Sequence, residues 1–435
     1  MTNTISKSRL ETIEVEVRQA VATTPVCDVH THLYDPAFGP LLLWGIDALL
    51  VYHYVVAEAF RFLPLSCERF WALSKTEQAN LIWEALFIEH SPVSEACRGV
   101  LTTLNALGLD ANQRDLPAIR QWFAEWKVED YLERCLELAG VSTLCMTNSP
   151  FDDVERGIWE RGFTRHPAFT AALRIDPLLL QWNEAVPRLA QWSYAVTPEL
   201  SPKTVDETRR FLADWTRRIQ ARYLMVSLPP GFNYPAQTEC AQLMEKAVLP
   251  HCRDYGLPFA LMLGVKRGVN PGLRLAGDGV GPCQLESLEN LCAQNPSNKF
   301  LVTVLARENQ HGLCVAARKF PNLHLFGCWW FTNIPTVIDE MTRMRLELLG
   351  TSFTVQHSDA RVLDQIIYKW RHSRAIIADV LVEKYLALAQ TGWEPSNDEI
   401  ERDVKDLFGG TFAKFCSPVS SSIDLPAKGF DGQGF

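Results

Sequence analysis

Residues 25–36 read PVCDVHTHLYDP, and this stretch has the pattern of a short buried strand that ends in polar residues. Val26, Cys27 and Val29 are β-favouring apolar residues, and a proline stands at each end. His30 and His32 are two positions apart, so on a strand they share one face. Two imidazoles at a strand end are a common way to hold a divalent transition metal. The alternative is two polar residues where a strand meets a loop, and the rest of the chain must decide.

Similar apolar, β-rich segments recur along the chain. Including the first, they span residues 26–32, 141–147, 169–175, 222–228, 258–264, 299–305, 323–331 and 351–357. Helical patterns lie between them, for example at 152–162, 207–221, 240–256 and 285–296. Eight strands that alternate with helices predict an α/β protein with a (β/α)8 TIM barrel. A doubly wound sheet is the alternative, but it calls for a glycine-rich phosphate turn after an early strand, and the sequence has none.

A long segment separates the first two predicted strands. Residues 38–138 are rich in Trp, Leu, Glu and Ala and have the pattern of several helices. We predict that they form a helical insertion at the C-terminal face of the barrel, where active sites are built. The predicted units are then an N-terminal helix with the first strand (1–37), the insertion (38–138), the rest of the barrel with C-terminal helices (139–415) and a loosely held tail (416–435).

Composition limits the partners and the compartment. The 435 residues carry a formal net charge of −9, which argues against nucleic acid as the main partner. The 12 cysteines form no C-x-x-C pair and lie in apolar segments, as reduced thiols of a cytoplasmic protein do. The N-terminal residues lack the apolar region of a secretion signal. Four charged or polar residues interrupt the apolar stretch 39–63, so we predict that it covers a buried site and does not cross a membrane.

In a TIM barrel the C-terminal ends of the strands converge on one pocket. Here they carry His30, His32, Asn148, Ser149, Arg174, Trp329, Trp330, His357, Asp359 and Arg361. Two histidines and Asp359 would make three ligands for a divalent metal, with positions left open for substrate. Asp359 has two alternative roles, as a catalytic base or as the cap of the helix that follows it. For Arg174 the alternative is an ion pair with Asp176, and for the tryptophans it is core packing.

Several of these motifs occur in an order that resembles the uronate isomerases, which are divergent members of the amidohydrolase superfamily. The segments are DVHTHL (28–33), VYHYVV (51–56), LRIDP (173–177), MLGVKRG (262–268), AGDGVG (276–281), GCWWF (327–331) and SDAR (358–361). The resemblance covers roughly residues 10–415. It implies a distorted (β/α)8 barrel that interconverts D-glucuronate with D-fructuronate, or D-galacturonate with D-tagaturonate.

The resemblance also implies roles for individual residues. Metal ligands would be His30, His32 and Asp359, and zinc is our first choice on ligand type. Aldose–ketose isomerisation moves a proton from C2 to C1 through an enediol, which calls for a base, a proton donor and a group that polarises the carbonyl. Asp359, Tyr54 and Arg361 would fill these catalytic roles. The residues that would bind the substrate are His53, Arg174, Arg267 and Trp330, with Arg174 suited to hold its carboxylate.

The sequence departs from the family pattern at two places. Met262 stands where the family carries a histidine on the fifth strand, and a thioether cannot donate a hydrogen bond. Asn148 and Ser149 stand where acidic residues are expected after the second strand. The alternatives are therefore a rearranged isomerase, an enzyme for another sugar acid, or a homologue that has lost activity.

Two further alternatives belong to other functional classes, a metal-dependent hydrolase and a non-catalytic binding protein. A hydrolase of this superfamily would often use a lysine on the fourth strand and histidines on the fifth and sixth, and the predicted strands lack these. We also expect a homo-oligomer, as is common for large enzymes of this kind.

Overall fold

In the computed structural model, which describes residues 7–417, the centre is a curled sheet of seven parallel strands. They are hydrogen-bonded in the order β1-β2-β3-β4-β5-β8-β9. This arrangement confirms the predicted α/β class and is consistent with a distorted (β/α)8 barrel. Their bounds are β1 Val26–Thr31, β2 Val141–Asn148, β3 Phe169–Arg174, β4 Ala221–Leu228, β5 Phe259–Leu263, β8 Phe300–Val304 and β9 Leu323–Leu325.

The strands form where the sequence is almost continuously apolar. Every residue of β5 and β8 is buried, as expected when both faces of a parallel sheet are covered. Alternate residues on one face of the strands form a cluster of their own, which includes Val29, Met225 and Met262. The opposite face packs against the surrounding helices as part of the larger core. Burial on both faces therefore fixes the alternation that carries polar side chains to the strand ends.

The predicted eighth strand is wrong as a regular element, although the segment lies where a strand would close the barrel. On one side the Thr354 N–H donates to the Leu325 carbonyl oxygen at 2.9 Å. On the other side the Asp359 N–H donates to the His30 carbonyl oxygen at 3.1 Å. Asp359 has a φ of 50°, which is incompatible with an extended strand. Irregular backbone thus links β9 to β1, and this is the distortion of the barrel.

The seventh strand is also shorter than predicted. Residues 323–331 were expected to be extended, but β9 ends at Leu325 and the 3-10 turn η7 spans Trp330–Thr332. Gly327 has a φ of 63° and turns the chain out of the strand. The two tryptophans therefore lie in a loop above the strand end.

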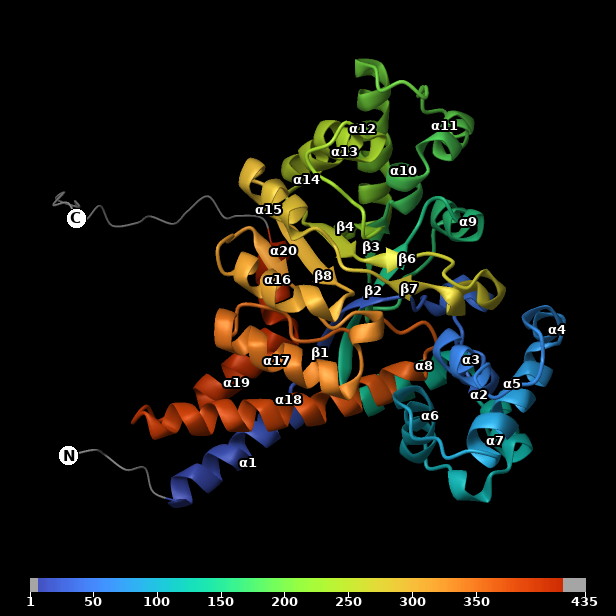
Figure 1. Ribbon diagram of the computed structural model, residues 1–435, viewed down its shortest axis with the longest axis vertical. Coiled ribbons are helices and arrows are strands. Elements are labelled where there is room, and N and C mark those ends of the chain that lie inside the picture. The colour runs from blue at the N-terminus through green and yellow to red at the C-terminus, as the bar shows by residue number, and fades with distance from the viewer. Residues whose placement is uncertain (1–6, 418–435) are drawn as a thin grey trace.

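Helices fill the chain between β1 and β2 and gather at one side of the sheet (Figure 1). In the described part of the chain, no helix is long and apolar enough to span a bilayer. The helices and turns of this segment are η1 Pro36–Leu41, α2 Ile46–Leu50, α3 His53–Ala59, α4 Cys67–Trp71, α5 Lys75–Trp83, η2 Glu84–Ile88, α6 Glu95–Ala106, η3 Ala111–Gln113, α7 Leu116–Ala124 and α8 Val128–Ala139.

The remaining helices follow the strands or close the chain. The long helix α18 (Gln365–Gln390) packs against α1 (Lys7–Thr23), α6, α8 and α17 (Pro335–Leu349), as Figure 1 shows. The predicted tail extends beyond Ser417, outside the described residues. The other helices and turns are α9 Asp153–Arg161, α10 Asp176–Leu180, α11 Trp182–Gln191, α12 Pro202–Ile219, α13 Glu239–Leu243, η4 Met244–Val248, α14 Leu249–Tyr255, α15 Leu285–Gln294, η6 Arg307–Asn309, α16 Gln310–Ala317, α19 Asn397–Lys405, η8 Asp406–Gly410 and α20 Thr411–Cys416.

A small hairpin extends beyond the C-terminal end of β5. Its strands β6 (Val265–Lys266) and β7 (Gly279–Val280) are antiparallel, and the turn η5 (Pro271–Gly277) lies between them. η5 packs against α3 and α4, which come from the helical segment after β1. The hairpin thereby connects the end of β5 with those helices above the strand ends.

Candidate active site

The structure brings the two histidines of the opening motif together with Asp359. The Nε2 atoms of His30 and His32 lie 3.5 Å and 3.4 Å from Asp359 Oδ1. In the described part of the chain, these residues form the one group of at least three potential ligands whose donor atoms all lie within 4.8 Å of one another. The sequence prediction that His30, His32 and Asp359 share a site therefore agrees with the geometry.

Neighbouring hydroxyl groups orient both imidazoles. His30 Nδ1 lies 3.3 Å from the Tyr223 hydroxyl, and His32 Nδ1 lies 2.9 Å from the Thr147 hydroxyl. The Nε2 atom of each ring therefore faces Asp359. Among residues 7–417, the buried His30 Nε2 and Asp359 Oδ1 have no hydrogen-bond partner. Two imidazole nitrogens and a carboxylate oxygen, fixed by outer hydrogen bonds and otherwise unpaired, fit a divalent metal.

The local electrostatics keep the donor atoms in the protonation states that a metal requires. Burial lowers the pKa of His32 to about 4. Burial alone would raise the pKa of the Asp359 carboxyl, but the two imidazoles outweigh that effect and hold this pKa well below its ordinary value. At neutral pH the site therefore presents a neutral His32 imidazole and an ionised carboxylate.

These residues lie at the floor of a cavity of about 400 Å³. The cavity gathers most of the predicted site: His30, His32, His53, Arg174, Arg267, Trp330, Asp359 and Arg361. Met262 lines it as well, at the position where a histidine was expected. Sequence reasoning missed Tyr52, Ser227, Arg274, Leu275 and Asp278 as lining residues. Arg274, Leu275 and Asp278 belong to the hairpin after β5, and the quoted AGDGVG motif was the signal that could have located them.

Tyr54 is the predicted residue that does not line this cavity. It lines a neighbouring cavity of about 330 Å³, which shares His53 and Trp330 with the first. The Tyr54 and His53 rings pack edge to face, with centroids 4.5 Å apart. The Tyr54 hydroxyl is buried without a hydrogen-bond partner within residues 7–417, and burial raises its pKa well above the ordinary value. Tyr54 is therefore a protonated phenol that lies in the neighbouring cavity, against the His53 ring.

The two strand-end arginines differ in how they are paired. The Arg174 guanidinium binds both carboxylate oxygens of Asp176, at 3.0 Å and 2.9 Å. That ion pair was the alternative role considered for Arg174, and the structure contains it. The Arg361 side chain makes no hydrogen bond or ion pair with any residue between 7 and 417, and it is exposed to the cavity. Arg361 is therefore a cation in the cavity that is available to an anionic or carbonyl oxygen.

The alternative role of Asp359 as a helix cap is wrong. Helix α18 begins at Gln365, and its N-cap residue is Asp364. The tryptophans are both buried, as the core-packing alternative expected, yet both line the cavity. Trp330 stacks on Phe331 with ring centroids 5.0 Å apart.

An acidic residue does reach the end of β2, from the helix that follows. The Glu155 carboxylate on α9 accepts hydrogen bonds from the Asn148 side chain at 3.0 Å and the Ser149 N–H at 2.9 Å. The Tyr34 hydroxyl donates to the same carboxylate at 2.7 Å. Burial raises the pKa of Glu155. Sequence reasoning looked for this acid on the strand and missed it on the helix.

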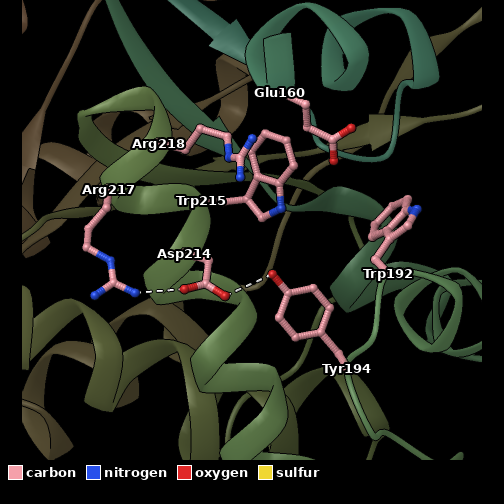
Figure 2. Close-up of a pocket in the computed structure, with 7 residues that line it drawn as sticks. All are labelled: Glu160, Trp192, Tyr194, Asp214, Trp215, Arg217 and Arg218. Atoms are coloured by element: carbon pink, nitrogen blue, oxygen red, sulfur yellow. Dashed lines mark hydrogen bonds and ion pairs between the residues drawn. The ribbon is translucent and has the colours of Figure 1, made fainter. Parts of the chain in front are cut away.

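A larger cavity of about 540 Å³ contains none of the predicted site residues. Figure 2 shows its lining, which comes from α9, α12 and the loop after α11. Its acidic groups are both engaged, because Asp214 accepts from the Tyr194 hydroxyl at 3.0 Å and pairs with Arg217 at 2.7 Å, and Glu160 lies 3.6 Å from Arg156. We therefore place the chemistry in the smaller cavity, where donor atoms remain unpaired.

Several solved structures with the same fold are uronate or glucuronate isomerases. A uronate isomerase from Bacillus halodurans C-125 is 52% identical, with a TM-score of 0.93, over 95% of this chain and 97% of that one. The fold is shared by a uronate isomerase from Thermotoga maritima, which is 16% identical, with a TM-score of 0.75, over 93% of this chain and 97% of that one. It is also shared by a glucuronate isomerase from Caulobacter crescentus, which is 16% identical, with a TM-score of 0.70, over 97% of each chain. No protein-family model and no curated protein matches the chain.

Identity at this level across nearly the whole of both chains exceeds what a shared fold alone produces. It agrees with the ordered motifs in the sequence and with the cavity that gathers them. The chain therefore belongs to the uronate isomerase family.

Proposed function

We propose that this protein is an aldose–ketose isomerase that interconverts an alduronate and the corresponding keturonate. The substrate pair is D-glucuronate with D-fructuronate or D-galacturonate with D-tagaturonate. The observation that carries the proposal is a single cavity that joins His30, His32 and Asp359 to two arginines, in a chain 52% identical to a uronate isomerase. A uronate is a small anion, and guanidinium groups suit its carboxylate.

The donor set supports a divalent metal, held by His30, His32 and Asp359. Mixed nitrogen and oxygen ligands are compatible with several metals, and zinc is our proposal. When bound, such an ion supplies Lewis-acid polarisation of a substrate oxygen.

The proposed proton transfers use residues of the chain itself. Asp359 removes the proton from C2 as the C1=C2 bond of the enediolate forms, and the electron pair of the carbonyl moves onto the oxygen at C1. Arg361, whose guanidinium is unpaired within residues 7–417, stabilises the charge that develops on that oxygen. A proton is then delivered to C1 while the hydroxyl at C2 passes its proton to the oxygen at C1 and becomes the ketone. Proton exchange with solvent water restores the Asp359 carboxylate and the proton donor. Tyr54 is the proposed proton donor, because it is a buried phenol beside His53.

Substrate binding is assigned to His53, Arg174, Arg267 and Trp330. Arg174 is held bidentately by Asp176, which orients its guanidinium toward the cavity. Arg267 pairs with Asp278 at 2.5 Å and lies over the Trp330 ring at 6.0 Å. This arrangement supports binding of an anionic substrate that contacts the Trp330 ring and the Arg267 guanidinium on the hairpin side of the cavity.

The test follows D-glucuronate and D-galacturonate in D₂O by NMR, after metal analysis of the purified protein. Ketose signals that increase with enzyme concentration support the proposal. Deuterium exchange at C2 without ketose would limit the activity to enolisation, and no exchange with either sugar acid would contradict the proposed substrate class. Hydrolysis is less well supported, because β4, β5 and β8 contain no lysine or histidine.

We further propose that the enzyme is a cytoplasmic homo-oligomer. The 12 free cysteines and the size of the chain support this proposal. Light scattering coupled to gel filtration tests the oligomeric state, and cell fractionation tests the location.

A further inference from the structure

The residue before Asp359 is held by buried charged groups at both of its backbone polar atoms. The Ser358 N–H donates to Asp28 Oδ1 at 2.9 Å. The Ser358 carbonyl oxygen accepts from Lys369 Nζ at 2.6 Å. Asp28 is fully buried and Lys369 is 4% exposed, so water does not compete for either contact. The backbone that carries the Asp359 carboxylate is therefore clamped directly upstream of it.

The clamp joins two distant parts of the chain. Asp28 lies on β1, two residues before His30, whereas Lys369 lies on α18. The next residue of α18, Trp370, donates from its indole nitrogen to Asp28 Oδ2 at 2.9 Å. Consecutive residues of one helix thus hold the two sides of the clamp. β1 supplies the His30 imidazole and the Asp28 carboxylate, and His32 follows directly after this strand.

Asp359 requires such support because its backbone is in the left-handed region. Its φ is 50°, a conformation that residues other than glycine adopt at a cost. Downstream, the Gln365 amide oxygen accepts from the Arg361 and Val362 N–H groups at 2.9 Å and 3.1 Å. The segment is therefore fixed on both sides of Asp359, and its side chain is directed at the two Nε2 atoms.

Buried charges are a costly way to stabilise a fold, since apolar residues of similar size often stabilise it as well or better. The presence of buried charges at Asp28 and Lys369 therefore indicates a role in the geometry of the site. We propose that Asp28 and Lys369 are positioning residues that hold the Asp359 carboxylate opposite His30 and His32 and thereby set the affinity of the metal site. This inference rests on the metal site of the proposed function, but it does not depend on which sugar acid is the substrate.

The test uses Co²⁺ as the probe, because its visible absorption reports ligand geometry independently of turnover. Lys369→Met keeps the apolar stem and removes the ammonium. We expect the Co²⁺ dissociation constant to rise by about 10–100-fold. The Co²⁺ spectrum should change, and kcat should fall more than KM rises. Lys369→Arg should restore part of the affinity. Lys384→Met, on the same helix but paired with Glu347 at the surface, is the matched control and should behave as the parent does.

If Lys369→Met does not fold, Trp370→Phe is the second variant, because it removes the hydrogen bond to Asp28 Oδ2 and keeps an aromatic ring in most of the buried indole volume. We expect a smaller change in affinity and the same direction of spectral change. Folded variants that bind Co²⁺ with the parent's affinity and spectrum would overturn the inference, even if their melting temperatures fall. A parent protein that binds no Co²⁺ would overturn the proposed metal site together with this inference. If the parent binds Co²⁺ and isomerises uronates, and the variants do both equally well, that result would overturn this inference alone.

Discussion

The Nε2 atom of His32 lies 3.4 Å from the Oδ1 atom of Asp359, although these residues come from opposite ends of the barrel sequence. The contact exists because the irregular segment after β9 is hydrogen-bonded to the end of β1 and to the residue that follows it. The Asp359 N–H donates to the His30 carbonyl oxygen at 3.1 Å, and the His32 N–H donates to the Ala360 carbonyl oxygen at 2.7 Å. The same backbone contacts that close the barrel therefore assemble the metal site. Substitutions that disrupt these backbone contacts are therefore expected to affect both the stability of the fold and the geometry of the metal site.

Asp359→Asn should bind metal more weakly and turn over substrate far more slowly. The amide keeps the shape of the side chain but loses the negative charge that serves as ligand and proposed base. We expect kcat to fall by about 100-fold or more, which is typical for loss of a general base. Metal per chain and initial rates are the measurements. Asp339→Asn, which breaks an ion pair with Arg343 on α17, is the control and should leave both unchanged.

Tyr54→Phe tests the proposed proton donor. The phenol is buried and unpaired in the described chain, so its removal creates no unsatisfied partner and folding should be unaffected. We expect kcat to fall by about 100-fold with little change in KM. Tyr255→Phe, at a position that is 42% exposed, is the control. Near-normal turnover in Tyr54→Phe would remove Tyr54 from the mechanism, and the same result in Asp359→Asn would remove the proposed base.

Gly327→Ala should destabilise the closure of the barrel. A Cβ atom at Gly327 would lie 1.8 Å from the Cδ2 atom of His357, so the buried ring would have to move. Gly256→Ala is the matched control, because Gly256 also has a positive φ but its Cβ would meet nothing within 4 Å. We expect Gly327→Ala to cost about 1–3 kcal/mol more than Gly256→Ala. Urea unfolding of both variants measures the difference, and equal losses would contradict the steric argument.

Stability should fall on acidification partly because of His324. This residue on β9 is 5% exposed, and its Nε2 atom is 2.9 Å from the Thr354 hydroxyl of the closing segment. Burial lowers the pKa of His324 to about 3, with Arg345 adding to the effect. Below the ordinary histidine pKa of about 6.5, the unfolded chain therefore binds a proton that the folded chain does not.

The free energy of unfolding should consequently decrease as the pH falls from about 6.5 toward 3. At pH 5 the contribution of His324 amounts to a loss of about 2 kcal/mol. His324→Gln should show a shallower pH dependence between pH 7 and pH 5 in urea titrations, and the exposed His311→Gln serves as the control. A variant at position 324 whose slope equals that of the parent would show that another group governs acid unfolding.

Much of the fold is readable from the chain because buried parallel strands have a simple signature. Segments such as FALML at 259–263 are apolar at every position, and seven of the eight predicted segments contain a strand of the sheet. The alternation of strand and helix indicates the barrel, and the spacing of His30 and His32 indicates one face of a strand. These are local patterns, and local physics suffices to interpret them.

The eighth predicted strand, at residues 351–357, is where prediction from local sequence patterns fails. Its residues favour a strand but form no regular one. Two residues further on, Asp359 takes a left-handed conformation beside Ser358, which Asp28 and Lys369 hold by hydrogen bonds. Glu155 was missed for a different reason, since the first turn of α9, directly after β2, brings its carboxylate back to Asn148 and Ser149. Tyr54 lies behind His53 and not in the cavity with it, which no spacing along a helix could have indicated.

The sequence by itself determined the elements, the identity of the ligand types and the family pattern, because propensity, burial and spacing act along the chain. Only the tertiary structure decided which atoms meet. It closed the barrel with irregular backbone, aimed one carboxylate at two imidazoles and left Arg361 unpaired among the described residues. Those outcomes depend on contacts between segments that are far apart in the sequence. The partners in these contacts set the free energy of a strained or charged residue, and the local sequence does not specify those partners.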